Sequence, residues 1–149
     1  MSTPKNQDPT INEMPLTGRT LELADIEALA LGAWILGTGG GGDPYHKLLN
    51  MRELYKNGHT VELVDPMSLK DDALVAVLSN MGAPLVGQER LADPAFAIKP
   101  VRMMERYLGR AFDAVMALEI GGGNGVHPML VAALSGYPVI DADTMGRAY

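Results

Sequence analysis

The chain has 149 residues, of which 47% are hydrophobic and 20% are charged, and its net charge is −6. This length suits one domain with a buried core, and the negative charge argues against a protein that neutralises nucleic-acid phosphates. The absence of cysteine excludes disulfides and thiolate chemistry, and no apolar run is long enough to span a bilayer. We therefore expect a cytoplasmic protein without a nucleic-acid or membrane partner.

The first half of the chain predicts a disordered leader followed by two helices. Residues 1–17 are polar and contain proline, which is typical of a disordered segment. Apolar residues between positions 23 and 36 follow helical spacing, and Gly37 is a natural stop. Asp43 and Pro44 have the form of a second helix start, with Asp as N-cap and Pro at the first helical position. Residues 57–58, Asn-Gly, end that second helix.

The rest of the chain alternates between short apolar strands and helices. We predict strands over residues 60–64, 73–78, 114–118 and 139–140, and helices over 98–108 and 128–134. This alternation predicts an α/β layered sandwich over residues 18–149, with a mainly parallel sheet and helices on both faces. Ligands of such sheets bind beyond the carboxyl ends of the strands, where the loops after the last three strands all carry glycine and polar groups.

Residues 37–42 form a Gly-Thr-Gly-Gly-Gly-Gly loop. Because glycine is costly to order, such a cluster indicates φ > 0 or a close approach of backbone to a ligand. The candidate substrate-binding residues are Gly39, Gly40, Gly41 and Gly42. Two alternatives remain: a flexible connector, and a dinucleotide site, since the loop matches G-x-G-x-x-G and Asp65 follows a strand. A helical segment before the loop and Asp43 at the next helix start weaken the dinucleotide interpretation.

Residues 119–125, Glu-Ile-Gly-Gly-Gly-Asn-Gly, follow a predicted strand and supply candidate catalytic groups. Glu119 suits a general base or metal ligand, and Asn124 suits a donor to a carbonyl or oxyanion of the substrate. His127 is the histidine nearest to this polar cluster and is a candidate catalytic or metal-binding residue. The alternative is a glycine-rich turn in which Glu119 and His127 only cap the next helix.

Residues 141–147 provide further polar groups after the last strand. Asp141 and Asp143 alternate, so an extended segment would place them on one side. With His127 they are the candidate ligands of a divalent metal, and Asp143 is otherwise a candidate acid or base. The alternative is that both carboxylates hydrogen-bond neighbouring loops. Arg147 could clamp a carboxylate, and Met81 could contact an apolar or sulfur-bearing substrate.

Four of these segments together resemble one family. Residues 30–45, 81–84, 117–125 and 141–148 are similar, in the same order, to motifs of the S-methyl thiohydantoin desulfurase-like family, a hydantoinase-related group. The resemblance covers the chain from Thr20 to its end. Family members are about twice this length and pair an N-terminal α/β domain with a second, mostly β domain, so we expect this chain to be the N-terminal domain of a longer protein.

The resemblance implies a hydrolase domain that acts on a hydantoin or S-methyl thiohydantoin-like ring, with water activated by a carboxylate, a histidine or a metal. A divalent metal is left open as cofactor. For partners, a homo-oligomer and a hydantoinase-type partner subunit remain open besides the small-molecule substrate. The competing hypotheses are the dinucleotide-binding domain and a ligand-binding or assembly module without chemistry.

Overall fold

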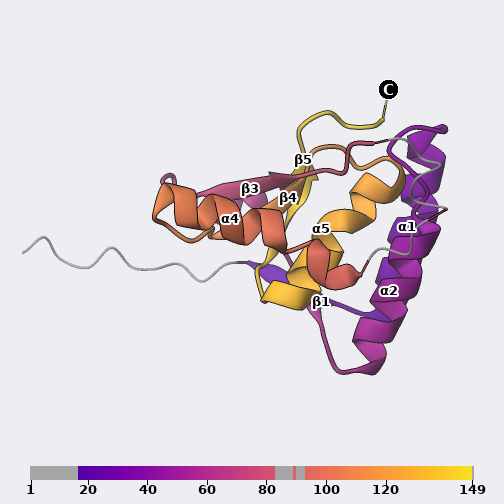
Figure 1. Cartoon of the computed structure of the whole chain (residues 1–149), viewed down its shortest axis with the longest axis horizontal. Helices are drawn as coiled ribbons and strands as arrows, with labels where there is room; N and C mark the ends of the chain where they lie inside the picture. Colours follow the sequence, from indigo (N-terminus) through magenta and orange to yellow (C-terminus); the bar gives the residue numbers. More distant parts are fainter. Residues whose placement is uncertain (1–16, 83–88, 90–92, 149) are drawn as a thin grey trace, which may run out of the picture.

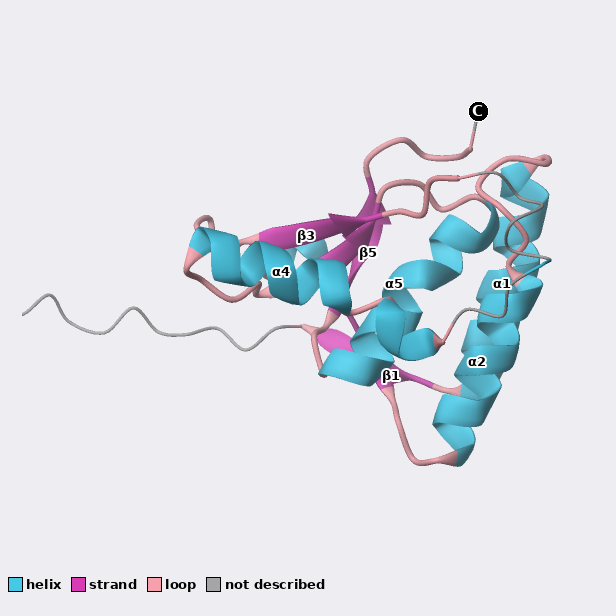
Figure 2. Cartoon of the chain, in the orientation of Figure 1, coloured by secondary structure: helices cyan, strands magenta, loops and turns pink. Residues whose placement is uncertain are grey.

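The computed structural model describes residues 17–82, 89 and 93–148. Its centre is a five-stranded sheet with the strand order β1-β2-β5-β4-β3 (Figures 1 and 2). The edge strand β1 pairs antiparallel with β2, and all other neighbours are parallel. The strands are β1 (Gly18–Leu21), β2 (Val61–Val64), β3 (Val75–Leu78), β4 (Ala114–Ala117) and β5 (Val139–Asp143). The expected α/β class with a mainly parallel sheet is confirmed.

Within the described part of the chain, four α-helices connect or flank these strands. They are α1 (Leu23–Gly37), α2 (Tyr45–Lys56), α4 (Lys99–Leu108) and α5 (Gly122–Ser135). Each of the first three lies within two residues of its predicted bounds. At the start of α2, Pro44 is the N-cap and the Asp43 carboxylate accepts a hydrogen bond from the Tyr45 amide at 2.8 Å. Two 3-10 helices, η1 (Pro66–Ser68) and η2 (Pro94–Phe96), complete the described elements.

Alternating strand residues divide the core between the two faces of the sheet. The larger cluster joins strand residues such as Val61, Val115 and Val139 to buried residues of all four α-helices. The smaller cluster contains Val64, Ala114 and Ile140, against which Leu69 packs directly after η1. Among the described residues, the connection from β2 to β3 therefore contributes Leu69 to the second face, whereas the buried residues of α1, α2, α4 and α5 belong to the cluster on the first face.

Two boundaries differ from the sequence prediction. Helix α5 begins at Gly122 rather than at Pro128, so the glycine-rich segment forms its first turn. Strand β5 continues to Asp143 instead of ending at Ile140, so Asp141 and Asp143 belong to the strand. Strand β1 was not predicted. The predicted leader falls on residues 1–17, of which 1–16 lie outside the described residues.

Helix α1 carries apolar residues on both of its faces. Ile26, Ala30 and Ala33 are buried, whereas Leu31 and Ile35 are 63% and 69% exposed. An exposed apolar stripe of this kind is typical of surfaces that pack against another protein or domain. No helix within the described ranges is long and apolar enough to cross a membrane.

Candidate functional site

The two glycine-rich segments pack directly against each other at the carboxyl end of β4. The amide of Gly123 donates to the carbonyl of Gly42 at 2.7 Å, and the amide of Asn124 donates to that of Gly41 at 3.1 Å. First-turn amides of a helix have no partner within the helix. The loop between α1 and α2 therefore caps α5. This long-range contact stabilises a first helical turn that consists largely of glycine.

Close backbone packing explains why several of these positions are glycine. Gly122 has φ +62°, and a Cβ there would lie 2.6 Å from the carbonyl oxygen of Gly42. A Cβ on Gly37 would lie 2.7 Å from the amide nitrogen of Gly122, and one on Gly41 would collide with the carbonyl oxygen of Gly121. The sequence predicted a close approach of the backbone to a ligand. At these positions the backbone of one glycine segment instead approaches the backbone of the other.

Part of the 39–42 loop nevertheless faces open space. A Cβ on Gly39 or Gly42 would meet no other atom of the described residues within 4 Å. The dinucleotide fingerprint, by contrast, fits poorly, because it requires a strand before the loop and a free helix N-terminus after it. Here α1 precedes the loop, and the Asp43 carboxylate already accepts the hydrogen bond of the Tyr45 amide.

Three chain segments meet at a buried carboxylate–amide pair. The Nδ2 group of Asn124 donates to Oε1 of Glu119 at 2.7 Å, and both side chains are buried. Oδ1 of Asn124 accepts a hydrogen bond from the amide of Asn80 at 2.8 Å. The structure therefore brings Glu119 and Asn124 together, as the strand-end argument predicted. Asn80 was missed, although it follows β3 by only two residues.

The Asn124 amide holds Glu119 in place. Its Oδ1 atom accepts a hydrogen bond from the Asn80 amide. Its Nδ2 group donates to Glu119 and, at 3.4 Å, to the Asn80 carbonyl. Asn124 was predicted to donate to the substrate; within the described residues its hydrogen bonds go to protein groups instead. Neighbouring Met81 is 99% exposed.

His127 lies one helical turn beyond Gly123 on α5, beside Lys47 of α2. Its Nδ1 atom is buried and has no hydrogen-bond partner within the described part of the chain. Burial, and secondarily the charge of Lys47, lower the pKa of His127 to about 4, so the imidazole is neutral near pH 7. Burial also lowers the pKa of Lys47, against the opposing effect of Asp43. Lys47 was not among the predicted site residues, because nothing in the sequence indicates its burial.

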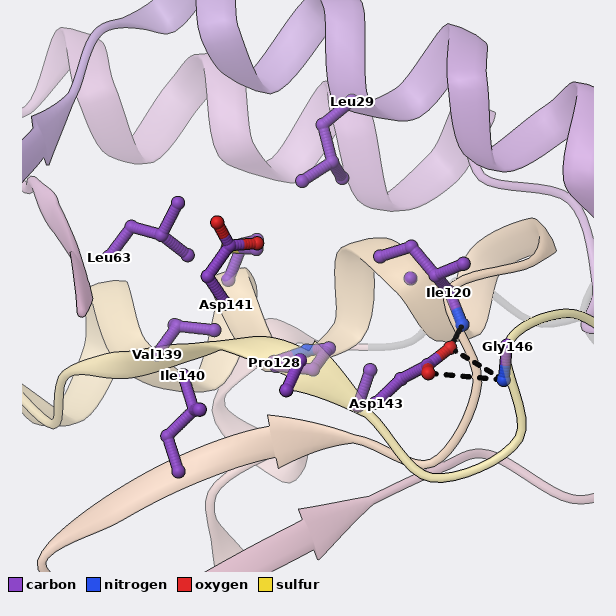
Figure 3. Close-up of a pocket in the computed structure, with 13 residues that line it drawn as sticks. Leu29, Leu63, Ile120, Pro128, Val139, Ile140, Asp141, Asp143 and Gly146 are labelled. Atoms are coloured by element: carbon purple, nitrogen blue, oxygen red, sulfur yellow. Dashed lines mark hydrogen bonds between the residues drawn. The ribbon is translucent and has the colours of Figure 1, made fainter. Parts of the chain in front are cut away.

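Asp143 stabilises a loop. Both of its carboxylate oxygens accept from the Gly146 amide at 3.0 Å, and Oδ2 also accepts from the Ile120 amide at 2.9 Å (Figure 3). For Asp143, this is the alternative in which the aspartates hydrogen-bond neighbouring loops. By fixing Ile120, the Asp143 carboxylate also fixes the backbone next to Glu119.

The predicted metal ligands are not assembled within residues 17–82, 89 and 93–148. No group of three or more His, Asp or Glu side chains that could hold a metal ion forms there. Asp143 is engaged by two backbone amides, and the charge beside His127 is the cation of Lys47. Arg147 is exposed on the segment after β5.

Together these contacts define an α/β domain with a buried Glu–Asn pair at the carboxyl edge of a mainly parallel sheet, where such sheets bind ligands. The chain belongs to the S-Me-THD-like family, and residues 24–149 match the N-terminal domain of that family. The expected family and domain are thereby confirmed.

A solved structure supports the same fold. A crystal structure of a protein from Chromobacterium violaceum is 31% identical to this chain, with a TM-score of 0.67. The match covers 88% of this chain but 36% of that one, so the chain spans about a third of the length of the protein that it resembles. No curated protein matches the chain.

Proposed function

We propose that this domain contributes the water-activating carboxylate for hydrolysis of a hydantoin or S-methyl thiohydantoin-like ring. The observation that supports it is the buried Glu119–Asn124 pair, with 2.7 Å between Oε1 and Nδ2. Within the described residues, this carboxylate accepts the Asn124 hydrogen bond at Oε1, which leaves Oε2 as the oxygen that could accept a proton. The family name supplies the substrate class.

The reaction assigns a separate task to each group. Glu119 takes a proton from water, and the water oxygen adds to the ring carbon that carries the methylthio group. The C–S bond then breaks, and Glu119 returns its proton to the leaving methanethiolate, which departs as methanethiol. The hydroxyl proton of the former water moves to the ring nitrogen, so that a ring carbonyl remains. In this scheme Glu119 is the catalytic residue, whereas Asn124 and Asp143 are positioning residues.

The open face of the glycine loop suits a flat ring. No atom of the described residues lies near the positions that side chains of Gly39 and Gly42 would occupy, and a ring could lie against the backbone there without a clash with these residues. Gly41 of this loop lies next to the Glu119 carboxylate: a Cβ atom added to Gly41 would be 3.2 Å from Oε1 of Glu119. The proposal requires that a ring on this loop bring its reacting carbon and a water molecule close to the Glu119 carboxylate.

The test is steady-state turnover of hydantoin and S-methyl thiohydantoin by the complete protein. Glu119→Gln keeps the shape and the Asn124 contact but removes the base, and we expect kcat to fall by roughly 10²–10⁴-fold. Glu62→Gln, on the exposed side of β2, is the matched control and should leave kcat unchanged.

Two results would reject the proposal. Full activity of the Glu119→Gln protein would show that another group activates water. Saturable binding of both rings without any turnover would favour the alternative of a ligand-binding module without chemistry.

A further inference from the structure

A mostly apolar cavity lies between the first face of the sheet and helices α1 and α5. Its volume is about 240 Å³, below the roughly 300–1,000 Å³ of sites for drug-sized ligands. Aliphatic residues from several elements line it, among them Met129 and, as labelled in Figure 3, Leu29, Leu63, Ile120 and Val139. Such a wall suits the apolar body of a small molecule.

One carboxylate in this cavity is not used by the protein. Asp141 lines the cavity but is itself exposed to solvent, and its carboxylate points between Leu29 and Leu63 (Figure 3). Within residues 17–82, 89 and 93–148 it forms no hydrogen bond and no ion pair, whereas nearby Asp143 accepts from two backbone amides. Asp141 is therefore the one acidic group of the cavity wall that is available to a ligand.

The topology places the cavity at the ligand-binding edge of the sheet. β2 and β5 are parallel neighbours, so their carboxyl ends lie side by side. Leu63 of β2 and Asp141 of β5 both line the cavity, at the edge where open α/β sheets bind ligands.

We propose that this cavity binds a compact organic cation, an ammonium group on a small apolar body. The ammonium would donate charge-assisted hydrogen bonds to Asp141, and the aliphatic wall would cover the body. A metal ion fits less well, because no three suitable ligands gather within the described residues. An anion would face the carboxylate without a cation among the wall residues. This proposal does not depend on hydrolysis at Glu119.

The probes are cyclohexylammonium, its neutral analogue cyclohexanol, and cyclohexanecarboxylate, each titrated into the protein by calorimetry. We expect saturable binding of the cation, weaker binding of the alcohol and no binding of the anion. Asp141→Asn should weaken the cation about tenfold or more, as expected for losing a charge-assisted hydrogen bond, and should leave the alcohol unchanged. Asp71→Asn removes the same charge from an exposed position outside the cavity and should change neither affinity.

A second measurement locates the ligand. Amide chemical shifts of Ile120, Val139 and Ala142 should move on titration with cyclohexylammonium, in proportion to the calorimetric saturation. The proposal is overturned if the Asp141→Asn protein binds the cation as tightly as the original, if the alcohol or the anion binds as tightly as the cation, if no cation binds, or if the shifts move only elsewhere.

Discussion

Replacement of Gly122 by alanine tests the contact between the two glycine segments most severely. The new Cβ would collide with the carbonyl oxygen of Gly40 and lie 2.6 Å from that of Gly42 and 2.7 Å from the carbonyl carbon of Gly41. All three neighbours are backbone atoms, so no side-chain rotation relieves the overlap. The backbone would have to separate, and with it the hydrogen bonds that cap α5 would be lost.

The cost has two parts. A residue with a side chain at φ +62° costs roughly 1–2 kcal/mol, and overpacking against fixed neighbours costs about 1–3 kcal/mol more. The sum is on the order of 2–5 kcal/mol. For a domain of this size that corresponds to a fall in Tm of roughly 5–15 °C, which calorimetry or circular dichroism can measure.

Two other glycines provide matched controls. Gly39 has φ +95° but open space around it, so Gly39→Ala should cost only the backbone term of about 1–2 kcal/mol. Gly32 lies within α1 in open space without positive φ, so Gly32→Ala should stabilise by up to about 1 kcal/mol. If Gly122→Ala melts within about 2 °C of the original protein, or no lower than Gly39→Ala, the packing argument is wrong.

Three further predictions concern the buried polar groups. Asn124→Asp would place a second carboxylate against Glu119, so urea unfolding should show a less stable protein. The loss of stability should be larger at about pH 8 than at about pH 5, because both carboxylates are charged at the higher pH. His127 has its pKa lowered from 6.5 to about 4 by folding, so stability should fall as pH decreases through that window, because the unfolded chain binds the proton first. His127→Gln should remove this pH dependence, so that the free energy of unfolding changes less between pH 6.5 and about pH 4. Replacement of the exposed His46 should leave the pH dependence as it is. Lys47→Met removes the nearby charge and should raise the pKa of His127 in an NMR titration; an unchanged pKa would show that burial alone lowers it.

Most of the fold could be predicted because apolar periodicity and stop signals agree along the chain. The pattern ending at Gly37 gave α1, and the strand before Glu119 was placed within one residue. β1 was missed because its four residues, Gly-Arg-Thr-Leu, show no alternation and are specified by pairing with β2. Pairing with a distant strand is not encoded in local pattern.

The start of α5 could not be predicted from local propensity. Glycine is a poor helix former and proline prefers the first turn, so Pro128 was taken as the start of the helix. In the structure the carbonyls of Gly41 and Gly42 accept the amides of the first turn. A contact between segments about eighty residues apart therefore overrides the intrinsic preference.

The candidate site was predicted in part for a similar reason. Strand ends converge in any parallel sheet, so Glu119 and Asn124 could be expected near one another. The partner of each carboxylate depends on side-chain geometry: Asp143 accepts from backbone amides, Asp141 faces the cavity, and His127 lies beside Lys47. Residue type and spacing alone do not distinguish these outcomes.

The most direct test of the proposed reaction centre is a crystal structure of the complete protein soaked with S-methyl thiohydantoin, using the slow Glu119→Gln variant. The account predicts a ring against the open face of residues 39–42, with its methylthio-bearing carbon, or a water beside it, within hydrogen-bonding reach of residue 119. A ring bound away from residue 119, with no path for water between them, would contradict it.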